Sequence, residues 1–210
     1  MTYIFFDVDG VLINGYHAKP ELRHCWDEHI ERDFGVKRQD FFEHYISGVF
    51  IQEVLVGKAG LLETLSSVLP RIGYSGDAQA FVDYWLQSDA RLNQDLIAQI
   101  AKLSTQPDVN LYIATNQEHN RAHYLMENLG LKQYFNDIYH SARIGHIKPV
   151  PAYFVAIAAD IGMDAGREII FFDDTQKVVD AANDFGWQAH QFDSVKDLAK
   201  APQLAQLLKL

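Results

Sequence analysis

Three segments of the chain are apolar at every position, unlike a half-exposed strand, in which apolar and polar residues alternate. Residues 3–6, 111–114 and 169–172 are rich in β-branched and aromatic side chains. Strands that are buried on both faces of a parallel sheet have this pattern. Residues 138–140 and 187–190 are weaker candidates for further strands.

Helical patterns fill the intervals between most of these strands. They cover residues 94–103, 118–129, 152–161 and 176–185, and a glycine directly follows each of the last three. Glycine in this position commonly ends a helix. The alternation of strands and helices predicts an α/β fold, with a Rossmann-like three-layer core around a largely parallel sheet.

The interval between the first two strong strands differs from the others because it contains several helical patterns and no confident strand. We expect an inserted α-helical cap domain over residues 16–92, with residues 1–15 and 93–210 forming the Rossmann-like core. Residues 49–56 fit either a strand or a helix. The helical patterns of the insert cover residues 21–34, 39–45, 59–69 and 77–87.

Composition narrows the function classes that this fold leaves open. The chain has 210 residues and a formal net charge of −10, which argues against nucleic acid and anionic membrane as partners. A single cysteine excludes an intramolecular disulfide and a cysteine-rich zinc site. The apolar start is short, and no stretch is long enough to span a membrane, so we expect a cytoplasmic protein.

Polar and acidic residues follow the three strong strands at the point where each strand ends. In an open parallel sheet these positions meet at one edge, where ligands bind. The residues are Asp7, Asp9, Thr115, Asn116, Asp173 and Asp174. Carboxylates gathered in this way repel one another and need a positive partner. A set of oxygen ligands suits Mg²⁺, and Lys148 is the candidate for a further positive charge.

Each of these residues alone could cap a helix or form a turn, but their order along the chain resembles that of a known family. The sequence is similar to the haloacid dehalogenase (HAD) superfamily in four motifs. They are Asp7-Val8-Asp9-Gly10-Val11-Leu12, Thr115-Asn116, Lys148-Pro149 and Asp173-Asp174. The long interval between the first two motifs fits members that carry a helical cap there.

The resemblance implies a hydrolase, and specifically a Mg²⁺-dependent phosphatase acting on phosphate monoesters. Asp7 would be the nucleophile that forms an aspartyl-phosphate. Asp9 would protonate the leaving oxygen and then activate water. Because Asp9 must hold a proton at one stage and release it at another, we expect its pKa to be raised.

The remaining motif residues would bind the phosphoryl group and the metal. Thr115, Asn116 and Lys148 would contact phosphoryl oxygens, and Lys148 would also orient Asp7. The metal ligands would be Asp7, Asp9 through its carbonyl, Asp173 and Asp174. Many members of the superfamily have Gly in place of Asp173 and Asp in place of Val178. Which acid of the fourth motif contacts the metal directly therefore stays open.

Other activities also remain open. Haloacid dehalogenases as a class lack the second acid of the first motif, so Asp9 favours a phosphatase. A phosphomutase would share all four motifs. Among non-enzymes, the alternatives are a phosphoacceptor signalling protein, which the long chain and the late acidic pair disfavour, and a catalytically degenerate phosphate-binding protein.

A cap encloses a small chamber, so we expect the substrate to be a small phosphorylated metabolite, such as a sugar phosphate. The candidates for recognising it are Asn14, Tyr16, His17, Gln117 and Glu118. His119 and His123 lie one helical turn apart, and we expect a solvated helix face there rather than a metal site. We expect the aromatic residues of the insert to form its core: Trp26, Phe41, Phe42, Tyr45, Phe81, Tyr84 and Trp85.

Overall fold

A five-stranded parallel sheet forms the centre of the computed structural model, which describes residues 1–162 and 168–209. The strand order is β3-β2-β1-β4-β5. The strands are β1 (Thr2–Phe6), β2 (Val109–Thr115), β3 (Asp137–His140), β4 (Glu168–Asp173) and β5 (Gln188–Gln191). The three strong segments and the two weaker ones all form strands, as the apolar pattern predicts.

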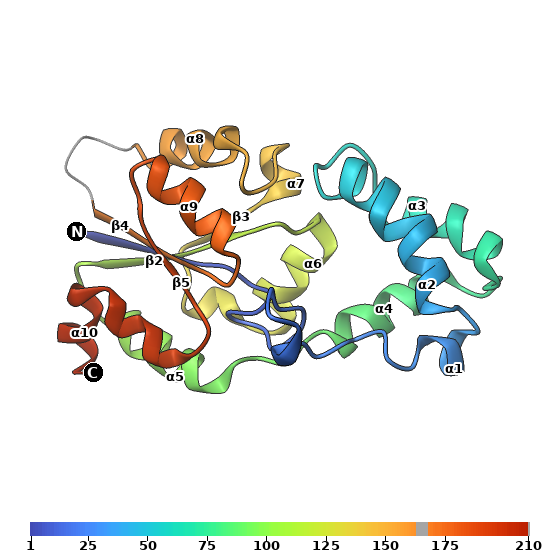
Figure 1. Ribbon diagram of the computed structural model, residues 1–210, viewed down its shortest axis with the longest axis horizontal. Coiled ribbons are helices and arrows are strands. Elements are labelled where there is room, and N and C mark those ends of the chain that lie inside the picture. Colours follow the sequence, from blue (N-terminus) through green and yellow to red (C-terminus); the bar gives the residue numbers. More distant parts are fainter. Residues whose placement is uncertain (163–167, 210) are drawn as a thin grey trace.

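Helices surround this sheet on both faces (Figure 1). The α-helices in the described part of the chain are α1 (Ile30–Phe34), α2 (Arg38–Phe41), α3 (Leu61–Val68), α4 (Ala78–Ser88), α5 (Gln94–Leu103), α6 (His119–His123), α7 (Ser141–Ile144), α8 (Pro151–Asp160), α9 (Gln176–Asp184) and α10 (Pro202–Leu208). The 3₁₀ segments are η1 (Pro20–Leu22), η3 (Leu69–Ile72), η5 (Leu131–Gln133) and η6 (Val195–Lys200), and the π-helical segments are η2 (Phe42–Val54) and η4 (Tyr124–Asn128). None of these described helices combines the length and apolarity needed to cross a membrane.

The central strand β1 explains why the core has three layers. Successive side chains of a strand point to opposite faces of the sheet. Ile4 and Phe6 belong to the hydrophobic cluster that includes residues of α5 and α10. Phe5 belongs to the cluster on the other face, with residues of α8 and α9 and with Trp187. An apolar residue is therefore needed at each of residues 3–6 of β1, and the fold is the Rossmann-like α/β core that the sequence predicts.

Residues 16–92, which lie between β1 and β2, form what we call the helical insert. It lies beside the end of the sheet to which the strands point, away from the chain termini (Figure 1). The insert has a hydrophobic cluster of its own, which includes Phe41, Tyr45, Phe81 and Trp85. Phe42, which the sequence analysis assigned to this core, is instead 54% exposed.

In the N-terminal part of the insert, one sequence prediction was wrong. A helix was expected over residues 21–34, but the chain is α-helical only from Ile30 onward. The preceding backbone makes other hydrogen bonds: the N–H of His24 donates to the carbonyl of Gly15. The Arg23 side chain also donates from Nε to the carbonyl of His17 at 2.6 Å. Residues 49–54, which fitted a strand or a helix, are helical, as part of η2.

We expect Ile4→Ala to destabilise the fold, because Ile4 is fully buried in the central strand. Removing buried methyl and methylene groups leaves a cavity, which costs about 2–5 kcal/mol. Urea unfolding followed by circular dichroism measures the loss. Val155→Ala on the exposed side of α8 is the control, and its effect should stay within about 0.5 kcal/mol. Equal effects of the two substitutions would contradict this description of the core.

Candidate active site

Three carboxylates meet where β1 and β4 end. The two strands are paired in register up to Phe6 and Phe172, so Asp7 and Asp173 follow at neighbouring positions. Each of Asp7, Asp173 and Asp174 offers an oxygen, and these oxygens lie within 4.8 Å of one another. A compact, buried set of oxygen donors fits a hard divalent cation such as Mg²⁺. The side chains of these three predicted residues could therefore hold a metal ion.

Gly10 allows the chain to pass close to this cluster. Its φ is +75°, a value that side chains disfavour. A Cβ atom at this position would lie 2.4 Å from Oδ2 of Asp174. Glycine is therefore required both by the backbone conformation and by the space beside Asp174.

Lys148 supplies a positive charge inside the acidic cluster. Its Nζ lies 2.9 Å from Oδ1 of Asp7 and 2.6 Å from Oδ2 of Asp173. It also donates to the carbonyl of Ala114 at 2.8 Å. Burial alone would lower the pKa of Lys148, but the charges of Asp173 and Asp7 outweigh it and raise this pKa. The ammonium group therefore stays protonated and offsets the repulsion between the carboxylates.

The second motif fixes the backbone of Lys148. The side-chain amide of Asn116 donates to the carbonyl of Lys148 at 3.0 Å and accepts from its N–H at 2.7 Å. The side-chain amide of Asn116 is therefore engaged with the backbone of Lys148. Thr115, the last residue of β2, is also buried at this edge of the sheet.

The carboxylate of Asp9 lies in a different environment from that of Asp7. It accepts hydrogen bonds from Nε2 of Gln117 at 2.6 Å and from Nη2 of Arg121 at 3.0 Å. Burial raises the pKa of Asp9, although the charge of Arg121 acts in the opposite direction. The raised pKa agrees with the expectation from the sequence.

Arg121 connects Asp9 to the end of the helical insert. Its Nη1 lies 2.9 Å from Oδ2 of Asp89, the residue that follows α4. The sequence analysis missed both Arg121 and Asp89, because neither belongs to a recognisable motif. The sequence offered one signal: Arg121 lies four residues before the apolar Leu125, so the two share one face of the predicted helix. In the structure both residues are buried.

The candidates for substrate recognition separate into two groups. Tyr16, Gln117 and Glu118 line a cavity of about 280 Å³ between the insert and the core. Asn14 and His17 line a different hollow. The carboxylate of Glu118 also accepts the N–H groups of residues 120 and 121, so it caps α6.

The two histidines that lie one turn apart are both exposed, in line with a solvated helix face. Nδ1 of His119 lies 3.0 Å from Nε2 of His140. In the described residues, no group of three potential metal ligands includes His119 or His123.

We predict that Asp89 makes the stability of the protein depend on pH. Burial raises the pKa of Asp89 to about 7 in the folded protein, compared with about 4 in an unfolded chain. The folded state therefore keeps a proton that the unfolded state loses. The stability from this group is complete below about pH 4 and is lost as the pH rises toward 7.

Urea unfolding of wild type and Asp89→Asn between pH 4 and pH 7.5 measures this effect. Because the variant lacks the titrating group, its stability relative to wild type should increase with pH by about 3–4 kcal/mol. Asp83→Asn, on the exposed side of the same helix, is the matched control. A difference between Asp89→Asn and wild type that stays constant over this range would contradict the prediction.

Solved structures with this fold include several enzymes of one superfamily. A HAD family enzyme from Bacteroides thetaiotaomicron is 19% identical, with a TM-score of 0.77 over 95% of this chain and 97% of that chain. The same enzyme has been solved in complex with magnesium and inorganic phosphate. A predicted HAD-like family hydrolase from Porphyromonas gingivalis is 23% identical, with a TM-score of 0.73 over 100% of this chain and 98% of that chain.

A structure with a different chemistry is also similar. The L-2-haloacid dehalogenase of Xanthobacter autotrophicus is 20% identical, with a TM-score of 0.61 over 100% of this chain and 86% of that chain. No curated protein matches this chain. The model of one protein family, the haloacid dehalogenase-like hydrolases, matches residues 1–186. This chain belongs to the haloacid dehalogenase-like hydrolases.

Proposed function

We propose that this protein is a Mg²⁺-dependent phosphatase that hydrolyses the phosphate monoester of a small metabolite through an aspartyl-phosphate on Asp7. The observation that carries the proposal is that the two acids of the first motif lie in different environments. Asp7 contacts the ammonium group of Lys148, which places a positive charge directly beside the proposed nucleophile. The pKa of Asp9 is raised by burial, which favours a proton donor.

The contacts of Asp7 indicate which of its oxygens would attack. The N–H of Val8 and Nζ of Lys148 both contact Oδ1, and among the described residues we find no hydrogen-bond donor to Oδ2. In the first step a bond forms between Oδ2 and phosphorus, while the bond from phosphorus to the leaving oxygen breaks. Asp9 gives its proton to that oxygen, so the leaving group departs as a neutral alcohol.

The second step returns Asp7 and Asp9 to the states that they had before the reaction. Asp9, now ionised, takes a proton from a water molecule, and the oxygen of that water attacks phosphorus. The bond between phosphorus and Asp7 breaks, and inorganic phosphate is released. Asp9 is then protonated and Asp7 is ionised, as they were before the first step.

The other motif residues would stabilise the negative charge on the phosphoryl oxygens during this reaction. Mg²⁺, when bound by the side chains of Asp7, Asp173 and Asp174 and the carbonyl of Asp9, would neutralise negative charge on the phosphoryl oxygens. Lys148, Thr115 and the N–H of Asn116 would contact the same oxygens. The complex of the Bacteroides enzyme with magnesium and inorganic phosphate supports a site for these two ligands in this fold.

The helical insert would act as the cap of this site. In this proposal residues 16–92 form one domain, and residues 1–15 and 93–210 form the catalytic core. The separate hydrophobic cluster of the insert supports such a division. The contact of Arg121 with both Asp9 and Asp89 joins the acid to the end of the cap.

A haloacid dehalogenase is the second candidate, because the Xanthobacter enzyme shares the fold. Asp9 argues against it, since a departing halide needs no proton. Release of halide from 2-chloropropionate, without release of phosphate from any monoester, would favour the dehalogenase. A phosphomutase would instead transfer phosphate between two positions of a substrate without releasing it.

We predict that Asp7→Asn lowers the rate of phosphate release from p-nitrophenyl phosphate by at least about 10³-fold, because the amide cannot form the covalent intermediate. Chelation of Mg²⁺ in wild type should have a similar effect, which added Mg²⁺ reverses. Asp184→Asn at the exposed end of α9 is the control and should retain activity. Full activity of Asp7→Asn would contradict the mechanism.

Asp9→Asn should reduce kcat by about 10²–10⁴-fold, because the leaving oxygen then departs without a proton. The reduction should be smaller for p-nitrophenyl phosphate than for an alkyl phosphate, since nitrophenolate is a good leaving group. Steady-state kinetics with both substrates measure the difference. An equal reduction for the two substrates would count against Asp9 as the general acid.

A further inference from the structure

The cavity between the insert and the core is the place for the leaving group, if the proposed function is correct. It has a volume of about 280 Å³, and Asp9, Asn116 and Arg121 lie on its core side. Because Asp9 would protonate the leaving oxygen, the rest of the leaving group must extend from Asp9 into this space. The volume is near the lower end for small-molecule sites, about 300–1,000 Å³, so the leaving group is small.

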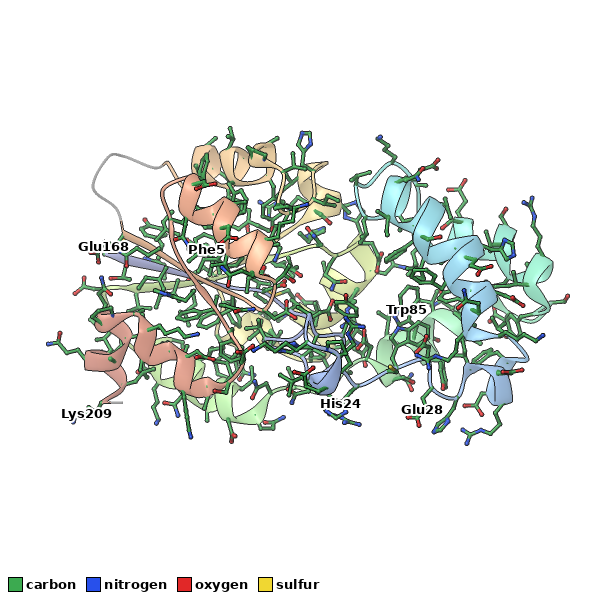
Figure 2. All side chains as sticks on the ribbon, in the orientation of Figure 1. Phe5, His24, Glu28, Trp85, Glu168 and Lys209 are labelled. Carbon is green, nitrogen blue, oxygen red and sulfur yellow. The ribbon has the colours of Figure 1, made fainter. Side chains whose placement is uncertain are left out.

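The insert side of this cavity is an aromatic wall. Trp26 and Trp85 stack with their ring centroids 4.6 Å apart and an angle of 13° between the planes. Phe41 packs edge-on against both of them, and Phe50 lies 5.4 Å from Trp85. Figure 2 shows Trp85 at the end of the insert nearest the core. The wall is held by its own packing, so it offers a preformed apolar surface.

The charged groups that line the cavity are already paired. The guanidinium of Arg38 lies 2.7 Å from Asp27, and that of Arg121 contacts Asp9 and Asp89. Among the described lining residues no cation is left without an acidic partner. With Asp9 protonated as the proposed reaction requires, the lining still holds the acids Asp27, Asp89 and Glu118 beside Arg38 and Arg121, so a carboxylate or second phosphate on the leaving group would meet no excess of positive charge.

Most of the polar side chains on the core side are also engaged. The amide of Asn116 bonds to the backbone of Lys148. The carboxylate of Glu118 caps α6, and Nε2 of Gln117 donates to Asp9. Two buried atoms of the lining residues, Nε of Arg121 and Oδ1 of Asp89, have no hydrogen-bond partner. A polyol with several hydroxyl groups would bury more of them than these two atoms could pair, which is unfavourable.

These contacts lead to a different substrate class from the sugar phosphates expected from the sequence. We infer that the substrate is the phosphate monoester of an uncharged alcohol that carries an aromatic or heteroaromatic ring, and that this ring packs against Trp26, Trp85, Phe41 and Phe50. The inference rests on the proposed function, because it assigns the leaving group of that reaction. The products are inorganic phosphate and the neutral ring alcohol.

Three phosphate esters of primary alcohols test this class on the wild-type enzyme with Mg²⁺. They are benzyl phosphate, glucose 6-phosphate and phosphoglycolate, in which the leaving group is aromatic, polyhydroxylated and anionic, respectively. We expect kcat/KM for benzyl phosphate to exceed the other two values by about tenfold to hundredfold, which corresponds to burial of one ring. A value for glucose 6-phosphate or phosphoglycolate equal to or above that for benzyl phosphate would overturn the inference, and the proposed phosphatase would stand.

A pair of matched variants tests the role of the cavity wall. Ile46 lines the cavity, whereas Ile51, in the same segment η2, is 40% exposed and does not line it. In Ile46→Arg the ratio of kcat/KM for benzyl phosphate to that for phosphoglycolate should fall at least tenfold, because the wall gains a cation. In Ile51→Arg the ratio should stay as in wild type.

An unchanged ratio in a folded Ile46→Arg would contradict the inference. If circular dichroism shows that Ile46→Arg does not fold, the wild-type comparison of the three esters decides. Absence of phosphate release from all three esters and from p-nitrophenyl phosphate would reject the proposed function together with the inference.

Discussion

The buried ammonium group of Lys148 is the interaction on which the arrangement of the site depends. The parallel register of β1 and β4 forces Asp7 and Asp173 together at one edge of the sheet. Two such charges 4 Å apart repel by roughly 4 kcal/mol at an effective dielectric constant near 20. Lys148 contacts both carboxylates, and Asn116 holds its backbone in place. The strand ends can therefore converge without unfolding the edge of the sheet.

The carboxylates of Asp7 and Asp9 lie in different environments although the two residues are close in sequence. The carboxylate of Asp9 turns toward Arg121 and Gln117 rather than joining the cluster of Asp7, Asp173 and Asp174. Arg121 also contacts Asp89 at the end of α4. In the proposed reaction, the position of the insert and the position of the proton donor are therefore linked through one buried guanidinium group.

The sequence was sufficient to predict the parts of the fold that depend on local pattern. The strands at residues 3–6, 111–114 and 169–172 are apolar on both faces, so their pattern is independent of what packs against them. The convergence of Asp7 and Asp173 followed from the rule that parallel strands end at one edge, and the need for a positive charge beside them pointed to Lys148. These predictions needed only the order of elements along the chain.

Features that depend on contacts between distant segments were not predictable in this way. Arg121 and Asp89 have no motif, and their pairing exists only because α4 ends beside α6. The helix expected at residues 21–34 is shortened because the chain near His24 bonds instead to the loop after β1. The paired state of Arg38, which leaves the cavity without a free cation, also appears only in three dimensions.

The most direct measurement is the detection of phosphate on Asp7 during turnover. The protein is mixed with Mg²⁺ and a phosphate monoester, quenched in acid within one turnover, digested and analysed by mass spectrometry. A phosphorylated peptide is expected, with the modification on Asp7 and with formation and decay rates that match turnover. Release of inorganic phosphate with no phosphorylated Asp7 at any time in the first turnover, or with the phosphate on another residue, would contradict the covalent mechanism.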